Sequence, residues 1–179
     1  MMGVRPAVFL DRDGVLCVEK SYVCKLDDLE IFPFVKKCIA DIHKKGFYAI
    51  VVSNQSGVAR GYFSEETLQE MNQRLLKETG VDDVFYCPHL INGIEARYKI
   101  DCNCRKPRIG MITAAQEKYA IDLQNSYIIG DRASDIQMGI NAGLKTILVN
   151  SGYGMERLEA DVEPDYICKD LQEAVEFVH

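Results

Sequence analysis

The sequence predicts an α/β protein in which helices cover both faces of a mostly parallel sheet, a Rossmann-like three-layer sandwich. Short apolar, β-branched runs alternate along the chain with stretches whose apolar residues recur at helical spacing. Charged and polar motifs follow several of these runs directly. With 179 residues, of which 47% are hydrophobic and 27% charged, residues 1–179 are expected to form a single domain.

Each helix is expected from its termini as well as from its periodicity. Pro33 suits the first position of a helix whose apolar residues continue to a stop at Gly46. Ser64 is a typical N-cap, Glu65 follows it in the first turn, and Gly80 ends that helix. Helices are therefore expected over about 33–45, 65–79, 109–119 and 134–142, and from about 170 onward.

The strands are short runs of the kind that is buried in a parallel sheet. They are expected at 7–10, 48–53, 84–87, 127–129 and 146–149, with Cys168 in a further strand. Residues 88–106 follow neither periodicity and are expected to form an irregular stretch. In such a sheet, ligands bind beyond the carboxyl ends of the strands. Polar motifs at those ends are therefore the candidates for one common site.

Bulk properties exclude several classes of function. The net charge is −6 and the isoelectric point about 5.1, which argues against a nucleic-acid or membrane partner. No apolar run approaches the length of a membrane span, and the apolar stretch 7–10 is too short for a signal peptide. We therefore expect a cytoplasmic protein whose seven cysteines are thiols or metal ligands. We expect a monomer, because no helix shows a surplus apolar face.

The first motif is Asp11-Arg12-Asp13-Gly14, directly after the first strand. Two carboxylates two residues apart at a strand end can meet one divalent cation, and hard oxygen ligands suit magnesium. Asp11 could attack phosphorus to form an acyl phosphate, while Asp13 protonates the leaving oxygen and later activates water. Taken alone, the motif is more typical of a solvated acidic turn.

Three further motifs complete the set. Ser53-Asn54-Gln55-Ser56-Gly57 offers a hydroxyl and backbone amides for phosphate oxygens. Arg105-Lys106-Pro107 offers a lysine that would neutralise a transferring phosphoryl group. In Gly130-Asp131-Arg132-Ala133-Ser134-Asp135, Asp131 would complete a cation site and Asp135 would support the lysine or the metal. Taken singly, these are a polar loop, a solvated basic pair and a helix N-cap.

Together the four motifs resemble those of the haloacid dehalogenase superfamily, in the same order and over nearly the whole chain. The resemblance implies a magnesium-dependent phosphatase with Asp11 as nucleophile and Asp13 as general acid and base. It further implies that the Ser53 hydroxyl and the Lys106 ammonium stabilise the phosphoryl group.

The same resemblance implies the metal ligands and the openness of the site. Magnesium would be bound by Asp11, the Asp13 carbonyl and Asp131, with Arg132 and Asp135 in supporting positions. Many relatives carry a large cap domain. Here only about 40 residues with one helix separate the first two motifs, so no large cap is expected.

A second metal site is predicted by Cys87-Pro88-His89 and Cys102-Asn103-Cys104, on either side of the irregular stretch. Three sulfurs and one imidazole form a closed tetrahedral set for zinc with no open position, so this ion would be structural. The zinc loop, about 87–106, would lead directly into the catalytic Lys106. A cluster of free cysteines is the alternative interpretation.

The zinc loop narrows the resemblance to one family, that of the D-glycero-D-manno-heptose 1,7-bisphosphate 7-phosphatases and histidinol phosphatases. The run 53–63, the long spacer between His89 and Cys102, and Gly110-Met111 after Arg-Lys-Pro resemble the heptose enzymes more closely. The resemblance implies a phosphorylated sugar as partner and removal of its 7-phosphate through an aspartyl-phosphate. Histidinol phosphate, or another small phosphorylated metabolite, is the alternative substrate.

Substrate contacts are also implied by this resemblance. Arg105 would hold the second phosphate or a sugar hydroxyl, because its fork binds phosphate bidentately. Further contacts are expected from Asn54, Gln55, Ser56, Arg60, Glu19 and Tyr22. Two other classes remain as alternatives, a non-catalytic zinc-stabilised module and a DNA 3′-phosphatase. The complete catalytic set disfavours the first, and the acidic net charge disfavours the second.

Overall fold

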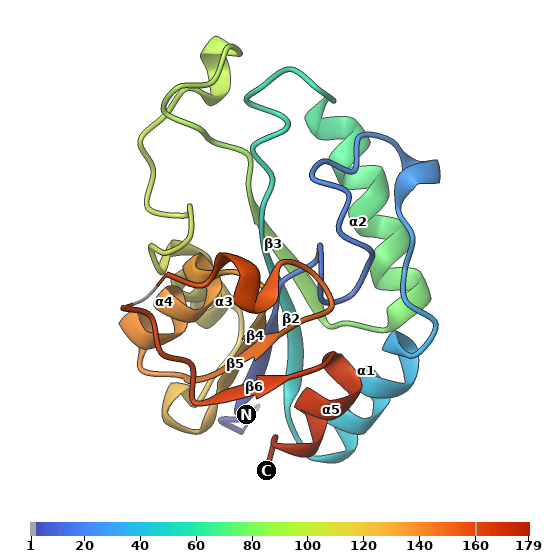
Figure 1. Ribbon diagram of the computed structural model, residues 1–179, viewed down its shortest axis with the longest axis vertical. Coiled ribbons are helices and arrows are strands. Elements are labelled where there is room, and N and C mark those ends of the chain that lie inside the picture. Colours follow the sequence, from blue (N-terminus) through green and yellow to red (C-terminus); the bar gives the residue numbers. More distant parts are fainter. Residues whose placement is uncertain (1–2, 160) are drawn as a thin grey trace.

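The computed structural model describes residues 3–159 and 161–179. A six-stranded sheet with the order β3-β2-β1-β4-β5-β6 forms its centre, and each neighbouring pair is parallel. The strands are Ala7–Leu10 (β1), Tyr48–Asn54 (β2), Asp83–Cys87 (β3), Tyr127–Gly130 (β4), Lys145–Val149 (β5) and Tyr166–Cys168 (β6). The predicted parallel α/β sandwich is thus confirmed (Figure 1).

Helices pack on both faces of the sheet. They are Val35–Lys44 (α1), Glu65–Thr79 (α2), Gly110–Lys118 (α3), Ala133–Ala142 (α4) and Leu171–Glu176 (α5). Helices α1, α2 and α5 contribute to the core on one face, and α3 and α4 to the core on the other. Figure 1 shows α1 and α5 side by side on their face of the sheet, away from α3 and α4.

Most helix termini follow the local signals. The Ser64 side chain caps α2 by accepting a hydrogen bond from the Thr67 N–H, and Gly80 ends it in the left-handed conformation with φ of 81°. Pro33 was expected as a first helical residue and instead lies in the turn before α1. The Val35 N–H bonds the carbonyl of Phe32 three residues back, so the regular helix starts only at Val35.

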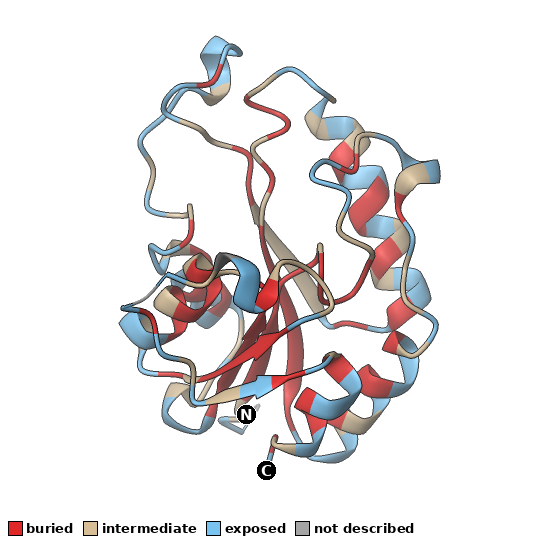
Figure 2. Ribbon diagram, viewed as in Figure 1, coloured by how far each residue is buried: buried red, intermediate tan, exposed pale blue. Residues whose placement is uncertain are grey.

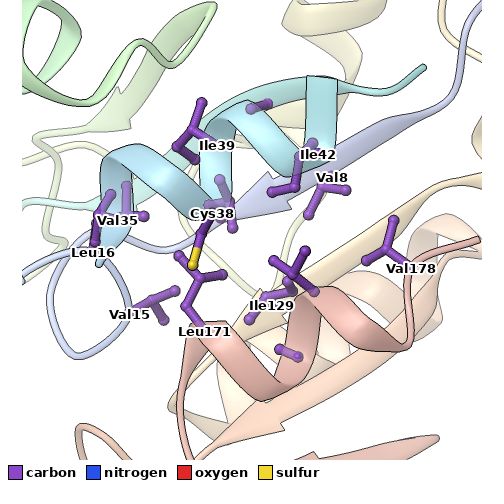
Figure 3. Close-up of a cluster of buried hydrophobic side chains, with 14 of the residues drawn as sticks. Val8, Val15, Leu16, Val35, Cys38, Ile39, Ile42, Ile129, Leu171 and Val178 are labelled. Atoms are coloured by element: carbon purple, nitrogen blue, oxygen red, sulfur yellow. The ribbon is translucent and has the colours of Figure 1, made fainter. Parts of the chain in front are cut away.

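Strand β1 is buried on both faces and alternates between two cores. Val8 and Leu10 pack toward α1 and α5, whereas Ala7 and Phe9 pack toward α3 and α4. Figure 3 shows the first of these cores, where Leu171 of α5 meets the side chains of α1. Burying one such side chain stabilises a fold by roughly 1.5–3 kcal/mol. The strand ends are therefore held by a closely packed frame, which Figure 2 shows as buried strands between half-exposed helices.

The edge of the sheet that carries the motifs is covered only by loops. Residues 15–34 include one short 3-10 turn, Leu26–Asp28, and residues 88–106 include another, Ala96–Tyr98. The second segment projects from the body of the protein as an extended loop (Figure 1). Within residues 3–159 and 161–179 no cap domain is inserted, as predicted. The same residues include no helix that is both long and apolar enough to cross a membrane.

Candidate active site and metal centres

The motifs converge where the order of the strands reverses. The chain runs outward from β1 through β2 to β3 and then returns to β4, so the carboxyl ends of β1 and β4 border the crevice in which open α/β sheets bind ligands. Asp11 follows β1, and its N–H donates to the Ile129 carbonyl at 3.0 Å. Ser53 and Asn54 end β2, and Asp131 follows β4. The predicted convergence of the motifs is therefore present.

Lys106 lies at the centre of this site. Its Nζ is 2.8 Å from Asp11 Oδ1, 2.6 Å from Asp135 Oδ1 and 2.9 Å from the Val52 carbonyl. Burial alone would lower the pKa of Lys106, but the charges of Asp11 and Asp135 outweigh burial and raise it. The lysine is therefore a fixed cation beside the predicted nucleophile.

The main chain of Lys106 is pinned to the end of β2. Its N–H donates to Asn54 Oδ1 at 3.0 Å, and Asn54 Nδ2 donates back to its carbonyl at 3.4 Å. The peptide bond between Lys106 and Pro107 is cis. Asn54 was expected to contact substrate. It lines the pocket, and it also fixes the position of the lysine.

Asp11, Asp131 and Asp135 form a buried acidic cluster whose ligand oxygens lie within 4.8 Å of one another. Burial, and then the charge of Asp135, raise the pKa of Asp11 to about 6, although Lys106 opposes the shift. Burial, followed by the charges of Asp11 and Asp135, raises the pKa of Asp131 to about 8. A bound cation would relieve this repulsion. Asp131 Oδ1 is buried and finds no hydrogen-bond partner among the described residues, so the donor set fits a hard divalent ion.

Asp131 is further held by the loop that follows β5. The Tyr153 N–H donates to Asp131 Oδ2 at 2.9 Å, and Ser151 Oγ donates to the Gly14 carbonyl at 2.6 Å. A Cβ on Gly14 (φ of 84°) or on Gly152 would collide with the Asp131 carboxylate. This loop was not predicted from the sequence, although the rule of strand carboxyl ends applies to β5 as well.

Asp135 acts on the lysine and on the start of α4. Its Oδ2 accepts the Arg132 N–H at 3.1 Å as part of a capping box, while its Oδ1 pairs with Lys106. The Arg132 side chain pairs with Glu19 at 3.0 Å and stacks over the Tyr153 ring at 4.4 Å. Asp135 is thus in contact with Lys106 and with the main chain of Arg132, and the supporting roles expected for Arg132 and Asp135 stay predictions. Glu19 does not line the pocket; it holds Arg132.

The side chain of Asp13 pairs with Arg12 and Gln55 and is not part of the acidic cluster. Arg12 Nε donates to Asp13 Oδ1 at 3.1 Å and Nη2 donates to Oδ2 at 2.9 Å, and Gln55 Nε2 donates to Oδ2 at 3.1 Å. Burial would raise the pKa of Asp13, but Arg12 and these hydrogen bonds hold it below the usual range of an aspartate. Arg12 was not singled out from the sequence, although an arginine between two aspartates is a natural counter-ion for them.

A pocket opens at this edge of the sheet. Five of the residues expected to contact substrate line it, together with Asp11, Asp13, Lys106 and Arg132: Tyr22, Asn54, Gln55, Ser56 and Arg105. Ser21, Val23, Gly57 and Ser134 also line it and were not predicted as contacts. Arg60 is not among the lining residues; its guanidinium lies 5.9 Å from the centre of the Tyr22 ring.

Ser53 and Gln55 are turned inward. Gln55 Nε2 donates to Ser53 Oγ at 2.8 Å, and Gln55 Oε1 accepts from Arg12 Nη2 at 3.2 Å. Both residues are at most 5% exposed. The amide of Gln55 therefore contacts the catalytic residues themselves, and the role predicted for the Ser53 hydroxyl stays a prediction.

The four predicted zinc ligands come together in space. Cys87 Sγ lies 3.4 Å from Cys102 Sγ and 3.0 Å from Cys104 Sγ, and His89 Nδ1 lies 3.3 Å from Cys104 Sγ. No disulfide links them. A tetrahedral site with Zn–S bonds of about 2.3 Å has ligand separations of roughly 3.8 Å, somewhat longer than these values. The donor set of three thiols and one imidazole fits a tetrahedral soft-metal site.

Comparison with known proteins assigns the chain to a family. A D-glycero-D-manno-heptose-1,7-bisphosphate 7-phosphatase of Thermosynechococcus vestitus is 39% identical, over 97% of this chain and 95% of its own length. The β-heptose enzyme of Haemophilus ducreyi is 37% identical, over 98% of this chain and 99% of its own length. The chain belongs to this phosphatase family. The family model described as HAD-hydrolase-like matches residues 103–174 and places the family among the haloacid dehalogenase-like hydrolases.

Solved structures agree with this assignment. The D,D-heptose 1,7-bisphosphate phosphatase of B. bronchiseptica, in complex with magnesium and phosphate, is 31% identical with a TM-score of 0.82, covering 96% of both chains. A HAD-like phosphatase of Mesorhizobium loti is 35% identical with a TM-score of 0.80, covering 98% of this chain and 85% of its own. The predicted family and fold are confirmed. As a member of this family the chain is a phosphoric monoester hydrolase, and phosphatases of this kind use magnesium.

Proposed function

We propose that this protein removes the 7-phosphate from D-glycero-D-manno-heptose 1,7-bisphosphate through an aspartyl-phosphate intermediate. The observation that carries the proposal is the pairing of Lys106 Nζ with Asp11 at 2.8 Å, in a pocket that also contains Asp13, Arg105 and Arg132. The substrate follows from relatives that cover almost the whole chain and carry that substrate in their names.

The reaction uses the two aspartates of the first motif. An Asp11 carboxylate oxygen attacks phosphorus, the bond from phosphorus to the sugar oxygen breaks, and Asp13 gives that oxygen a proton. Asp13, now ionised, then takes a proton from water as the water attacks the acyl phosphate. Phosphate leaves and the Asp11 carboxylate is regenerated. Arg12 holds the pKa of Asp13 low in the substrate-free site, so Asp13 keeps this proton for the next turnover only while the negative charge of a bound phosphoryl group offsets Arg12.

Lys106 stabilises the transferring group. Its charge lies beside the attacking carboxylate and would neutralise the negative charge that gathers on the phosphoryl oxygens. Asp11, the Asp13 carbonyl and Asp131 would hold magnesium, which supplies further charge neutralisation when bound. Asp135 also pairs with the lysine, at 2.6 Å, and helps to keep it in place.

We further propose that the Cys/His cluster binds a structural zinc ion. Cys87, His89, Cys102 and Cys104 fill all four positions of a tetrahedron, so no ligand position remains for substrate. Cys104 is followed directly by Arg105 and Lys106. The ion would therefore fix the chain that presents both basic residues to the pocket, within a single domain over residues 1–179.

The charge of the pocket favours a bisphosphate over histidinol phosphate. Arg105 and Arg132 line it, and Arg105 Nη1 is anchored to the His89 carbonyl at 3.4 Å. A second phosphate would find bidentate donors there. The ammonium of histidinol phosphate would meet like charge at Arg105.

The deciding experiment is magnesium-dependent phosphate release, measured side by side on both anomers of heptose 1,7-bisphosphate and on histidinol phosphate. We expect kcat/KM to be highest for one heptose anomer. A preference for histidinol phosphate would reject the substrate and leave the nucleophile unaffected. Asp11→Asn is the control, because it should remove activity on every substrate.

Arg105→Lys tests how the second phosphate is recognised. It keeps the charge and loses the bidentate fork, so KM for the bisphosphate should rise, while kcat/KM for a heptose 7-monophosphate should change little. Equal losses on the two substrates would show that Arg105 does not contact the second phosphate.

A further inference from the structure

Arg12 is a buried cation with no place in the mechanism given above. It is 1% exposed, and its backbone carbonyl accepts the N–H groups of Leu16 at 2.9 Å and Cys17 at 3.1 Å. A buried guanidinium is stable only where anions and acceptors surround it. Here its Nε and Nη2 reach both oxygens of Asp13, and Nη2 also reaches the Gln55 amide oxygen.

Arg12 and Asp13 form a bidentate ion pair, in which two N–H groups of the guanidinium contact the two carboxylate oxygens. Two parallel N–H groups hold the two carboxylate oxygens of Asp13, which fixes the plane of the carboxyl group as well as its position. Gln55 Nε2 adds a third donor at 3.1 Å, and Cys17 Sγ lies 3.3 Å from Asp13 Oδ1. The Asp13 side chain remains 19% exposed and lines the pocket, so these contacts do not close it off from a bound substrate.

We propose that Arg12 is a positioning residue for proton transfer, which aims the Asp13 carboxyl at the leaving oxygen of the substrate, with Gln55 as its second support. The inference rests on the proposed role of Asp13 as general acid. A positioning role differs from simple neutralisation of buried negative charge. Neutralisation would need a cation at this position, but not the bidentate hydrogen bonds of a guanidinium.

The test uses leaving groups that need the proton to different degrees. A sugar alkoxide is a poor leaving group and needs general acid catalysis, typically worth about 10²- to 10⁴-fold, whereas p-nitrophenolate leaves without a proton. The quantity to measure is kcat/KM, because it reports only the steps up to the aspartyl-phosphate. Later participation of Asp13 as a base then does not mask the difference.

We expect Arg12→Met to lower kcat/KM for the heptose bisphosphate by roughly 10²-fold or more, and by much less for p-nitrophenyl phosphate. Asp13→Asn is the benchmark and should show the same selectivity. Arg12→Lys keeps the charge and loses the fork, so it should resemble Arg12→Met. A lysine variant with native activity on both substrates would overturn the positioning role in favour of simple neutralisation.

Two further variants guard the interpretation. Gln55→Met removes one donor to Asp13 Oδ2 without removing a charge, and decides the matter if the Arg12 variants do not fold; its loss should be smaller and equally selective. Arg74→Met is the control, because it breaks hydrogen bonds to the Leu26 and Leu29 carbonyls and should change kcat/KM for both substrates by the same factor.

If Asp13→Asn itself shows no selectivity between the substrates, the proposed role of Asp13 as general acid is wrong. If only the Arg12 and Gln55 variants lack this selectivity, the positioning role is wrong, while the role of Asp13 as general acid is retained.

Discussion

The protein has two clusters suited to metal ions, and they are built in opposite ways. The acidic cluster of Asp11, Asp131 and Asp135 lies on strand ends and at the start of α4, where all three residues are buried. The Cys/His cluster joins the end of β3 to an irregular loop, and three of its four residues are only half-buried. The first cluster is positioned by the sheet, whereas most of the second depends on contacts within a loop.

The acidic cluster is preorganised by the sheet, whereas the loop that carries most of the Cys/His cluster needs an internal support. Packed strands hold the carboxylates close together against their own repulsion, so the binding site for the cation exists before the ion arrives. The three isoleucines of loop 88–106, Ile91, Ile94 and Ile100, are exposed and therefore do little to order it, and β3 anchors only one of the four cluster residues. Lys106 contacts the acidic cluster and lies two residues after Cys104 of the Cys/His cluster. Disorder in the loop would therefore displace this lysine from the active site.

The largest effect should come from Asp11→Asn, which removes the nucleophile. Turnover should fall by roughly 10⁴-fold or more, as for other nucleophiles that act within a catalytic unit. Zinc content should be unchanged, and without magnesium the variant should melt at a higher temperature, because one buried charge is gone from the repulsive cluster. Phosphate release, metal analysis and thermal melting measure these outcomes; retained turnover would reject the mechanism.

Cys104→Ser tests whether zinc binding orders the loop and, through it, Lys106. We expect loss of zinc, a melting temperature lower by roughly 5–10 °C and a fall in activity that added magnesium does not restore. Cys24→Ser is the matched control, since Cys24 is half-buried and lies outside the cluster. Full activity in a zinc-free variant would show that the loop holds Lys106 without the ion.

The acidic cluster should make stability depend on pH in the absence of magnesium. The pKa of Asp11 is raised from 3.8 to about 6 and that of Asp131 from 3.8 to about 8, so the folded state binds more protons than the unfolded state between these values. Stability should therefore fall as pH rises from about 4 to 8, by at most about 1.4 kcal/mol per pH unit for each group.

Thermal melting across this pH range, with and without magnesium, checks the prediction. Magnesium should raise the melting temperature more at pH 8 than at pH 5, because it takes the place of the bound protons. Asp131→Asn should flatten the upper part of the metal-free profile. A metal-free melting temperature that rises steadily up to pH 8 would contradict the proposed repulsion.

The smallest effect should come from Tyr98→Phe. The Tyr98 hydroxyl donates to Glu65 Oε2 at 2.7 Å and ties the zinc loop to the first turn of α2, where the Tyr86 hydroxyl also bonds Glu65. Loss of one such part-buried bond should cost no more than about 1 kcal/mol and leave kcat unchanged. A clear loss of zinc affinity on removal of this hydroxyl would show that the loop depends on α2 as much as on its ligands.

The sequence predicted those parts of the site in which strand order determines position. Asp11, Asp131 and the strand-end motifs follow from the parallel sheet, and the Cys/His cluster follows from paired spacing. The direction of a side chain depends on tertiary packing. The inward turn of Gln55, the fork of Arg12 and the role of Glu19 as a partner of Arg132 were therefore not predictable from local pattern.

Asn54 and Lys106 lie 52 residues apart in the sequence, and the reciprocal hydrogen bonds between them join the two ends of the intervening segment. Everything between them, including α2, β3 and the zinc loop, is an excursion that begins and ends at the same point of the active site. Most of its tip, at residues 91–100, is exposed. Exposed loop tips tolerate insertions well. Lengthening this tip is therefore a route by which the specificity of the scaffold could be engineered while its chemistry is left in place.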